Sequence, residues 1–87
     1  MYYVYILKSI KDKKLYVGCT KDLKKRINMH NSRQVFSTKF RRPFEIIYYE
    51  AYKNKEDAFE REKFLKTGWG RNYIRQVLKH YFENLGG

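Results

Sequence analysis

Tyr3-Val4-Tyr5-Ile6 and Leu15-Tyr16-Val17-Gly18 are the two stretches that decide how the fold begins. Both alternate as half-buried strands do, and both are rich in aromatic and β-branched residues. Residues 11–14 between them are lysines and an aspartate, which suit a turn. The pattern predicts a β-hairpin with strands over residues 2–9 and 15–18. The first strand then has two faces, one with Tyr3, Tyr5 and Leu7 and the other with Tyr2, Val4 and Ile6.

A helix, a loop and a third strand are expected next. Thr20 can cap a helix over about residues 21–31, because its side chain can accept a hydrogen bond from a free amide of the first turn. A basic loop leads to Pro43, which would end any helix before it. Residues 44–52 alternate again and predict a strand, with Phe44, Ile46 and Tyr48 on one face and Ile47, Tyr49 and Ala51 on the other.

Two further helices complete the predicted order ββαβαα. Asn54 can cap a helix that runs to about Thr67, with Gly68 in the position where helices commonly end. The last helix is expected over about residues 71–82. One of its sides is apolar, and the other carries a basic ridge at four-residue spacing, formed by Arg71, Arg75 and Lys79.

The composition indicates a small basic domain. We expect a single domain over residues 1–87, because this length supports one modest core. Twenty Lys and Arg against nine Asp and Glu give a net charge of +11, which favours a polyanionic partner such as nucleic acid. The chain also has nine tyrosines, whose flat faces suit base stacking as well as core packing.

The same composition excludes several classes of protein. The single Cys19 rules out an intramolecular disulfide and a cysteine-based zinc site, and it fits a reducing compartment. No apolar run approaches the roughly 20 residues that span a bilayer, and the amino terminus does not resemble a signal peptide. No predicted helix pairs a basic face with a wide apolar one, which argues against a membrane surface. We therefore expect a cytoplasmic protein with no membrane partner.

The first helix carries polar groups where apolar ones are expected. At about 100° per residue, Leu23, Ile27 and His30 share one stripe, and Arg26 and Asn31 flank it. Such groups are costly near a core unless hydrogen bonds satisfy them. One interpretation makes His30 a hydrogen-bonded core histidine and lays the stem of Arg26 along the sheet. The other makes both residues part of a functional site.

Glu62 raises the same question in the second helix. It shares the apolar stripe with Ala58, whereas Glu56 and Glu60 lie on the solvent side. A buried salt bridge to Arg26 is one explanation, although buried pairs stabilise proteins poorly. Because two helices each aim charged groups at the same sheet, a shared site explains the pattern better.

These residue types are the ones that phosphodiester hydrolysis needs. Arg26 suits bidentate contact with phosphate oxygens. Glu62 alone suffices for Mg²⁺, which often binds through one or two carboxylates and completes its shell with water and phosphate. Tyr5 and Tyr16 are candidates to hold or deprotonate the attacking water. Deprotonation requires a nearby cation or metal, because tyrosine ordinarily titrates near about 10.

With these residues the chain resembles the GIY-YIG nuclease superfamily, and within it the small single-domain members grouped as YhbQ-like or UPF0213-type proteins. Tyr3-Val4-Tyr5 stands at the Gly-Ile-Tyr motif, and Tyr16-Val17-Gly18 stands at the Tyr-Ile-Gly motif. Residues 22–31 are similar to the helix that carries the family's arginine. Residues 58–66 are similar to the segment that holds its metal-binding glutamate. The resemblance extends over about residues 2–78.

The resemblance implies an α+β fold in which three helices flank a three-stranded antiparallel sheet. It also implies an endonuclease that hydrolyses DNA with one Mg²⁺ or Mn²⁺ ion. In this scheme Tyr5 or Tyr16 acts on the water, Arg26 stabilises the phosphate, Glu62 binds the metal and His30 assists.

Four positions add detail to the resemblance. Tyr3 replaces the first glycine of the motif, and Arg33 stands where a glycine is expected, so the loop before Pro43 is reshaped or gains a phosphate contact. Gly18 is expected to permit close approach of backbone, unless it is a plain strand-end glycine. We interpret Cys19 as a small buried filler, because no neighbour forms a dyad that would activate a thiol.

Seven basic residues outside this set are predicted to contact nucleic acid. We expect DNA as the partner, with RNA left open, and we expect recognition by backbone or structure because no base-reading residue is identifiable. A partner protein or a homodimer would supply targeting. The rival hypothesis is a nucleic-acid-binding module on the same scaffold with little or no cleavage. The seven residues are Lys39, Arg41, Arg42, Lys66, Arg71, Arg75 and Lys79.

Overall fold

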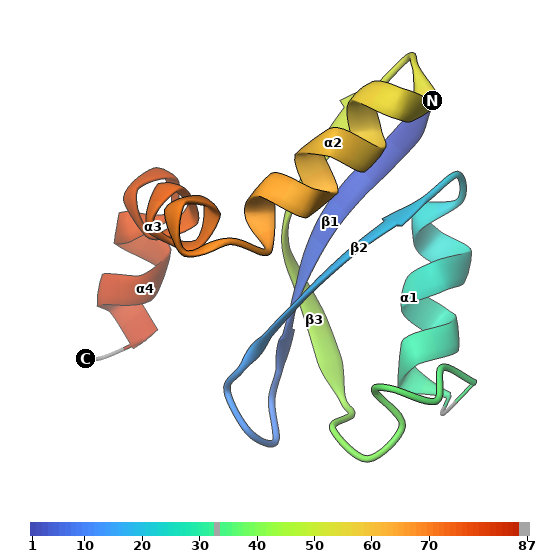
Figure 1. Ribbon diagram of the computed structural model, residues 1–87. Coiled ribbons are helices and arrows are strands. Elements are labelled where there is room, and N and C mark those ends of the chain that lie inside the picture. Colours follow the sequence, from blue (N-terminus) through green and yellow to red (C-terminus); the bar gives the residue numbers. More distant parts are fainter. Residues whose placement is uncertain (33, 86–87) are drawn as a thin grey trace.

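The computed structural model describes residues 1–32 and 34–85 and has the element order ββαβααα (Figure 1). Arg33, for which we expected a role in the loop after the first helix, lies outside the described residues. In the described ranges, no helix is long and apolar enough to cross a membrane. The elements are β1 (Tyr2–Ser9), β2 (Leu15–Thr20), α1 (Leu23–Asn31), β3 (Phe44–Tyr52), α2 (Lys55–Leu65), α3 (Gly68–Val77) and α4 (Lys79–Leu85).

The predicted three-stranded antiparallel sheet is confirmed, with the strand order β2-β1-β3. β1 is the central strand, and its residues from Val4 to Ser9 are buried without interruption because both of its faces are covered. Tyr5 pairs with Gly18 of β2 on one side and with Tyr49 of β3 on the other. β2 is thus an edge strand. The second half of the predicted hairpin is two residues longer than expected.

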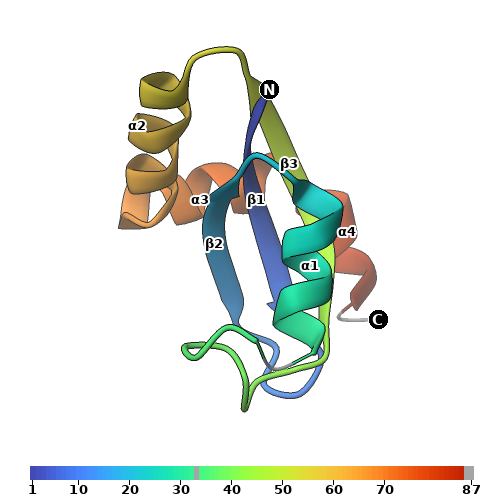
Figure 2. The same ribbon diagram turned by 90° about the vertical axis from the view of Figure 1, so that its right-hand side faces the viewer.

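Two small apolar cores lie on opposite faces of the sheet, under the helices that Figure 2 shows on either side of it. One lies under α1 and the other under α2 and α3, and alternate residues of β1 contribute to both. The first core contains Tyr5, Leu7 and Phe44, with Leu23 and Ile27 packed against it. The second contains Val4, Ile6, Ala58, Leu65 and Ile74. As a result, α1 and α2 approach the sheet from opposite sides.

A β-bulge changes the faces that were predicted for β3. The pairing of β1 with β3 shifts register in the middle of β1, which leaves one residue of β3 extra. Ile47 and Tyr48 therefore both pack against the core under α2 and α3. Tyr49 lies against Tyr3, with ring centroids 6.0 Å apart. The prediction that Tyr48 shares a face with Phe44 was wrong, because simple alternation does not reveal an inserted residue.

The predicted N-cap of α2 is confirmed, whereas the predicted N-cap of α1 is wrong. Asn54 caps α2 as predicted, by accepting hydrogen bonds from two amides of the first turn. α1 is capped by Asp22, whose carboxylate accepts from the amide of Lys25 at 3.0 Å. The hydroxyl of Thr20, the predicted cap, accepts from the amide of Asp22 at 3.1 Å and so lies outside the helix.

The predicted third helix is two helices, α3 and α4. Gly68 does not follow the end of α2 but begins α3, and the Thr67 hydroxyl caps it by accepting from the amide of Gly70 at 3.1 Å. Gly70 permits a tight junction between α2 and α3, because a Cβ atom there would lie 2.1 Å from the carbonyl oxygen of Phe64. α3 ends at its C-cap, Leu78, and α4 follows directly.

Candidate active site

The Tyr5 phenol is the centre of the candidate site, and Gly18 makes room for it. The two residues are cross-strand partners in β1 and β2. A Cβ atom on Gly18 would lie 2.3 Å from the Tyr5 hydroxyl oxygen, closer than any van der Waals contact. The expected close approach at Gly18 thus involves a side chain and not a backbone segment. It places the Tyr5 hydroxyl over β2, at the edge of the sheet.

A buried chain of hydrogen bonds holds this hydroxyl. It lies 3.0 Å from Nε2 of His30, and Nδ1 of His30 lies 2.8 Å from Oγ1 of Thr38. His30 and Thr38 are fully buried, and Tyr5 is 1% exposed. Burial, and then the charge of Arg26, lower the pKa of His30 to about 4. The imidazole is therefore neutral at neutral pH, with one nitrogen donating and the other accepting.

Thr38 is the member of this chain that sequence reasoning missed. It lies in the loop between α1 and β3, and its hydroxyl donates to the carbonyl oxygen of Val35 at 3.4 Å. Asn31 fixes the end of α1 to β3, because its amide nitrogen donates to the carbonyl oxygen of Phe44 at 3.1 Å and its oxygen accepts from the amide of Phe44 at 2.6 Å. A loop threonine has no periodicity, so the sequence carries no signal for its role.

Tyr16 lies beside this chain on the edge strand β2. Its ring meets the His30 ring edge-on with centroids 4.9 Å apart, and it is tilted against the Tyr5 ring at 6.5 Å. Unlike Tyr5, Tyr16 is only half-buried. The two tyrosines of the sequence motifs are therefore neighbours, but Tyr16 is the one that a substrate can reach more readily.

Arg26 and Glu62 bring opposite charges to the Tyr5 hydroxyl from the two faces of the sheet. Arg26 comes from α1 and is half-buried, and Glu62 comes from α2 with 22% of its side chain exposed. Burial raises the pKa of Tyr5 most, followed by Tyr16; Arg26 opposes this rise and Glu62 adds to it. Arg26 and Glu62 thus act on the same hydroxyl although their helices cover opposite faces of the sheet. We call Tyr5, Tyr16, Arg26, His30 and Glu62 the edge cluster.

Glu62 does not form the buried salt bridge to Arg26 that was one explanation of its position. Its carboxylate lies 3.2 Å from Nζ of Lys66, one turn along α2, and not in an ion pair with Arg26. Burial, and then Glu62, raise the pKa of the Cys19 thiol, which keeps this neighbour protonated. Glu56 and Glu60 are exposed, as the helix geometry predicted.

A second polar cluster, which sequence reasoning missed, joins α2 to β3. Arg61 forks onto the Glu50 carboxylate, with Nε to Oε1 at 2.8 Å and Nη2 to Oε2 at 2.9 Å. The Tyr52 hydroxyl donates to Oε1 at 2.6 Å, and the Tyr48 hydroxyl donates to Oε2. We call these four residues the Glu50 network. The available signal was the alternation of Tyr48, Glu50 and Tyr52 on a single face of β3.

Two of the three basic residues predicted to bind nucleic acid in the loop before β3, Lys39 and Arg41, are engaged within the protein. Nζ of Lys39 lies over the rings of Phe36 and Phe40, at 4.6 and 4.9 Å. Arg41 pairs with Asp12 of the β1–β2 turn at 2.8 Å. Nε of Arg42 is buried without a hydrogen-bond partner in residues 1–32 and 34–85.

The basic residues near α3 are more open to a ligand. Arg71 and Arg75 are exposed and line the same surface hollows, and Lys66 is exposed at the end of α2. Lys79 is also exposed but begins α4, so the three residues of the predicted basic ridge belong to two helices and not to one. The ridge assumed one unbroken helix, which the end of α3 at Leu78 prevents.

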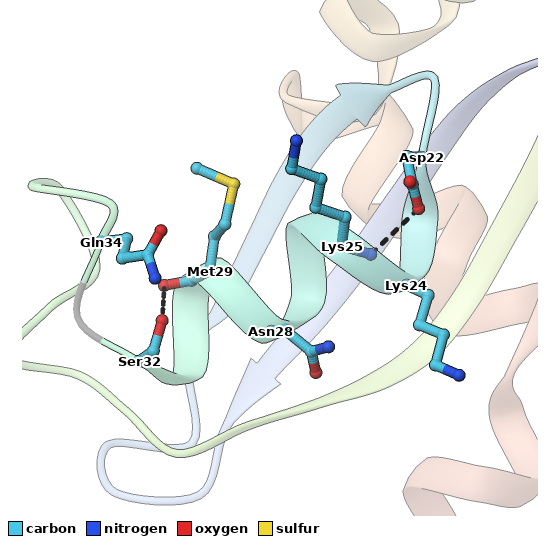
Figure 3. A pocket seen from close by; sticks show the side chains of 7 residues that line it. All are labelled: Asp22, Lys24, Lys25, Asn28, Met29, Ser32 and Gln34. Atoms are coloured by element: carbon cyan, nitrogen blue, oxygen red, sulfur yellow. Dashed lines mark hydrogen bonds between the residues drawn. The ribbon is translucent and has the colours of Figure 1, made fainter.

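The hollow drawn in Figure 3 lies on the outer side of α1, away from the edge cluster. It has a volume of about 550 Å³ and is formed by α1 and the chain just beyond it. Lys24 and Lys25 project from opposite sides of the helix, and Lys25 and Met29 point the same way (Figure 3). A neighbouring hollow includes Arg26 beside Lys25 and Met29. The first hollow contains no member of the edge cluster, and the second contains only Arg26.

Comparison with known proteins identifies the family of the chain. The model of the GIY-YIG catalytic domain matches residues 1–74. The chain belongs to the GIY-YIG family. This family is one of nuclease-type enzymes, which implies a nucleic acid substrate. GIY-YIG nucleases generally use divalent metal ions.

Relatives of known sequence and structure are small GIY-YIG proteins of the UPF0213 type. A UPF0213 protein of Staphylococcus saprophyticus is 45% identical over 67 residues, which cover 76% of this chain and 80% of that protein. One of Clostridium perfringens is 45% identical over 67 residues, covering 76% and 71%. The solution NMR structure of a UPF0213 protein from Bacillus halodurans matches with a TM-score of 0.55, 32% identity, and coverage of 88% and 85%.

The side chains of the edge cluster fit a metal ion held mainly by water and substrate. Within residues 1–32 and 34–85, no three His, Cys, Asp or Glu side chains group as a metal site. Glu62 supplies one half-buried carboxylate, and Mg²⁺ commonly binds through one or two carboxylates while keeping several waters. A GIY-YIG site with a single protein ligand is consistent with this donor set.

Proposed function

We propose that residues 1–87 act as one domain, a metal-dependent endonuclease that hydrolyses DNA and recognises backbone or structure and not base sequence. The observation that carries this proposal is a pair of half-buried opposite charges, Arg26 on α1 and Glu62 on α2, that both act electrostatically on the hydroxyl of Tyr5. The net charge of +11 adds support, because it favours binding of phosphates without regard to sequence.

In this mechanism the two charged residues divide the work on the phosphate. Arg26 contacts the non-bridging oxygens, whose negative charge grows in the transition state. Glu62 would hold Mg²⁺ or Mn²⁺, which supplies positive charge beside the phosphate when bound. The ion pair of Glu62 with exposed Lys66 would open for this purpose, and such exposed pairs contribute little stability.

The two tyrosines have different tasks in this mechanism. Tyr16, the more accessible, holds the attacking water by a hydrogen bond to its hydroxyl. Tyr5 is a positioning residue, because burial keeps its phenol protonated and out of reach of the substrate. If the Thr38 hydroxyl donates to Val35, it accepts from Nδ1 of His30, and Nε2 then accepts the proton of Tyr5.

The test of the whole proposal is a cleavage screen on plasmid, single-stranded, branched and RNA substrates with Mg²⁺ or Mn²⁺. Glu62→Gln should lower the rate by at least about 100-fold while leaving DNA binding intact. Glu60→Gln is the matched control, because Glu60 is an exposed carboxylate on the same helix. If pure wild-type protein cuts no DNA substrate with either metal, the endonuclease proposal fails.

The assignment of the tyrosines needs a separate comparison of Tyr16→Phe with Tyr5→Phe. We expect Tyr16→Phe to lower kcat about 10-fold more, because only this hydroxyl would contact the water. Tyr5→Phe should lower the stability as well, because it leaves Nε2 of His30 without its partner. A larger loss of kcat in Tyr5→Phe would exchange the two roles.

The alternative function is a nucleic-acid-binding module with little or no cleavage. The observation that favours it is the Lys66–Glu62 ion pair, which occupies the carboxylate that a metal would need. It predicts tight binding, no cutting, and no change in binding when Mg²⁺ is added. Lys66→Ala separates the two functions, since it should increase metal affinity if the site is catalytic.

A further inference from the structure

Trp69 is an exposed aromatic residue that the edge cluster does not explain. It is the only tryptophan of the chain, stands in the first turn of α3, and is 80% exposed. The hollow beside it has a volume of about 430 Å³ and is lined by Arg71, Asn72 and Arg75 as well. A large exposed ring that lines the same hollow as two arginines offers a flat apolar face near positive charge.

Two more hollows connect this place to the edge cluster. One, of about 510 Å³, shares Arg71 and Arg75 with the first and adds Lys13 and Lys14 from the β1–β2 turn. The next, of about 210 Å³, shares Arg71 with the second and adds Lys66 and Tyr16. Lys66 in turn contacts Glu62. The three hollows are therefore linked by shared lining residues, Arg71 and Arg75.

We propose that these linked hollows, the Trp69 groove, bind an unpaired strand of nucleic acid that continues from the cleavage site, with one base stacked on Trp69. The groove consists of Lys13, Lys14, Lys66, Trp69, Arg71 and Arg75. Five cations along these linked hollows suit contacts with phosphates, and such contacts carry no information about base sequence.

Trp69 is the reason why we propose an unpaired strand and not a duplex as the ligand. Inside a duplex the faces of each base are covered by its neighbours, so only an unpaired or terminal base can stack on a protein ring. This inference rests on the proposed function and narrows its substrate class. The preferred substrate has a single-stranded segment next to the cut, and a blunt duplex is a poor one.

Trp69 itself provides the measurement, because no other tryptophan contributes to the fluorescence. Full-length Glu62→Gln protein is titrated with an oligothymidylate of about 15 nucleotides and, separately, with a blunt duplex. We expect saturable quenching by the single strand at a concentration at least about 10-fold lower than by the duplex. Equal responses, or none, overturn the proposal. Quenching or a blue shift with anionic phospholipid vesicles but not with the oligonucleotide also overturns it.

Variants link the signal to the groove. Arg71→Ala with Arg75→Ala should weaken binding about 10-fold or more and lower the slope of log affinity against log salt by about 1.4. Lys24→Ala with Lys53→Ala removes the same charge from exposed positions outside the groove and is the matched control. Trp69→Phe should bind nearly as well by fluorescence anisotropy of a labelled strand, and Trp69→Ala about 10-fold more weakly.

Different results would contradict the proposed groove and the proposed endonuclease activity. If wild-type protein cuts DNA while the double arginine variant binds the oligothymidylate as well as wild type, the groove is wrong and the nuclease assignment stands. If the groove binds as expected and nothing is cut, the nuclease assignment is wrong. An unchanged circular dichroism spectrum for each variant shows that its fold is intact.

Discussion

Arg61 and Glu62 are neighbours on α2, yet they belong to two very different polar clusters. Arg61 turns toward β3, where its guanidinium and the hydroxyls of Tyr48 and Tyr52 surround the Glu50 carboxylate. Glu62 turns toward β2, where the one ion pair found for it in the described ranges is with exposed Lys66. The Glu50 network satisfies its charges internally, and the edge cluster does not.

The protonation behaviour of the two clusters follows this difference. Burial opposes ionisation of Glu50, but the hydrogen bonds from Arg61, Tyr48 and Tyr52 together lower its pKa below the ordinary value. Burial, and then Glu50, raise the pKa of Tyr52 to about 12. Each group is thus held in the charge state that suits its neighbours. In the edge cluster, charges of both signs surround a phenol without neutralising each other, which is typical of a site awaiting a ligand.

The two arginines offer the largest contrast between the clusters. Arg26→Ala should lower the cleavage rate about 1000-fold, equivalent to about 4 kcal/mol, with little effect on stability. Arg61→Ala should cost about 3 kcal/mol of unfolding free energy, because it leaves the half-buried Glu50 carboxylate without its cation. Urea denaturation and cleavage assays on both variants make the test. Loss of both properties in both variants would erase the distinction.

The pH dependence of stability separates the clusters next. The pKa of His30 is lowered to about 4 from 6.5, so between these values the unfolded chain binds a proton that the folded protein does not. The free energy of unfolding should therefore fall by about 3 kcal/mol as the pH drops from about 6.5 to about 4. Urea denaturation of wild type and of His30→Gln over this pH range measures the free energy of unfolding. This free energy should fall less steeply with decreasing pH in the variant.

Glu50 should affect the free energy of unfolding over a lower pH range than His30 does. Its pKa is lowered below 4.5, so its contribution is present above this value and is lost only at lower pH. Glu50→Gln should consequently leave the slope between pH 6.5 and 4.5 unchanged. A slope that changes as much in this variant as in His30→Gln would contradict the assignment.

Gly18→Ala tests how much the edge cluster depends on its buried anchor. The new methyl group would displace the Tyr5 ring and break its bond to His30, which should cost about 2 kcal/mol of stability and reduce cleavage. Gly68→Ala is the control, because a Cβ atom there meets nothing within 4 Å. Equal stability of the two variants, measured by thermal melts, would mean that the Tyr5 ring moves freely.

Tyr52→Phe should have the smallest effect. It removes one of the hydrogen bonds to Glu50 and leaves the Arg61 fork in place, so we expect a loss of about 1 kcal/mol. Cleavage should be unchanged, since the network lies on the β3 side of α2. A drop in cleavage larger than about 3-fold would mean that the two clusters are energetically coupled.

The sequence was most informative where local periodicity decides the structure. Alternation predicted the three strands, and the Asn54 cap predicted the start of α2. The helical geometry of α1 and α2 also indicated that His30 and Glu62 occupy unusual positions. The core-histidine interpretation describes the contacts of His30 well, and these contacts are compatible with a role in positioning Tyr5.

Features that depend on long-range geometry were not predictable. We expected the charged groups of the two helices to be aimed at the same sheet, and the structure adds that α1 and α2 lie on opposite faces of it. Periodicity assigns a residue to a face of its own helix and says nothing about which side of the sheet that helix covers. For the same reason the sequence did not predict three other features. These are the bulge in β3, the pairing of Arg61 with Glu50, and the contact of Thr38 with His30.

The order of the edge cluster along the chain has a consequence for the timing of synthesis. Tyr5, Tyr16, Arg26 and His30 all belong to the first 31 residues, and Glu62 arrives only with α2. A growing chain on the ribosome therefore contains the hairpin and α1 before it contains the carboxylate that the proposed metal requires. Only after α2 has been made and has packed on the far face does the cluster become whole. In the mechanism proposed here, a chain that ends before α2 lacks both the carboxylate for the metal and most of the Trp69 groove.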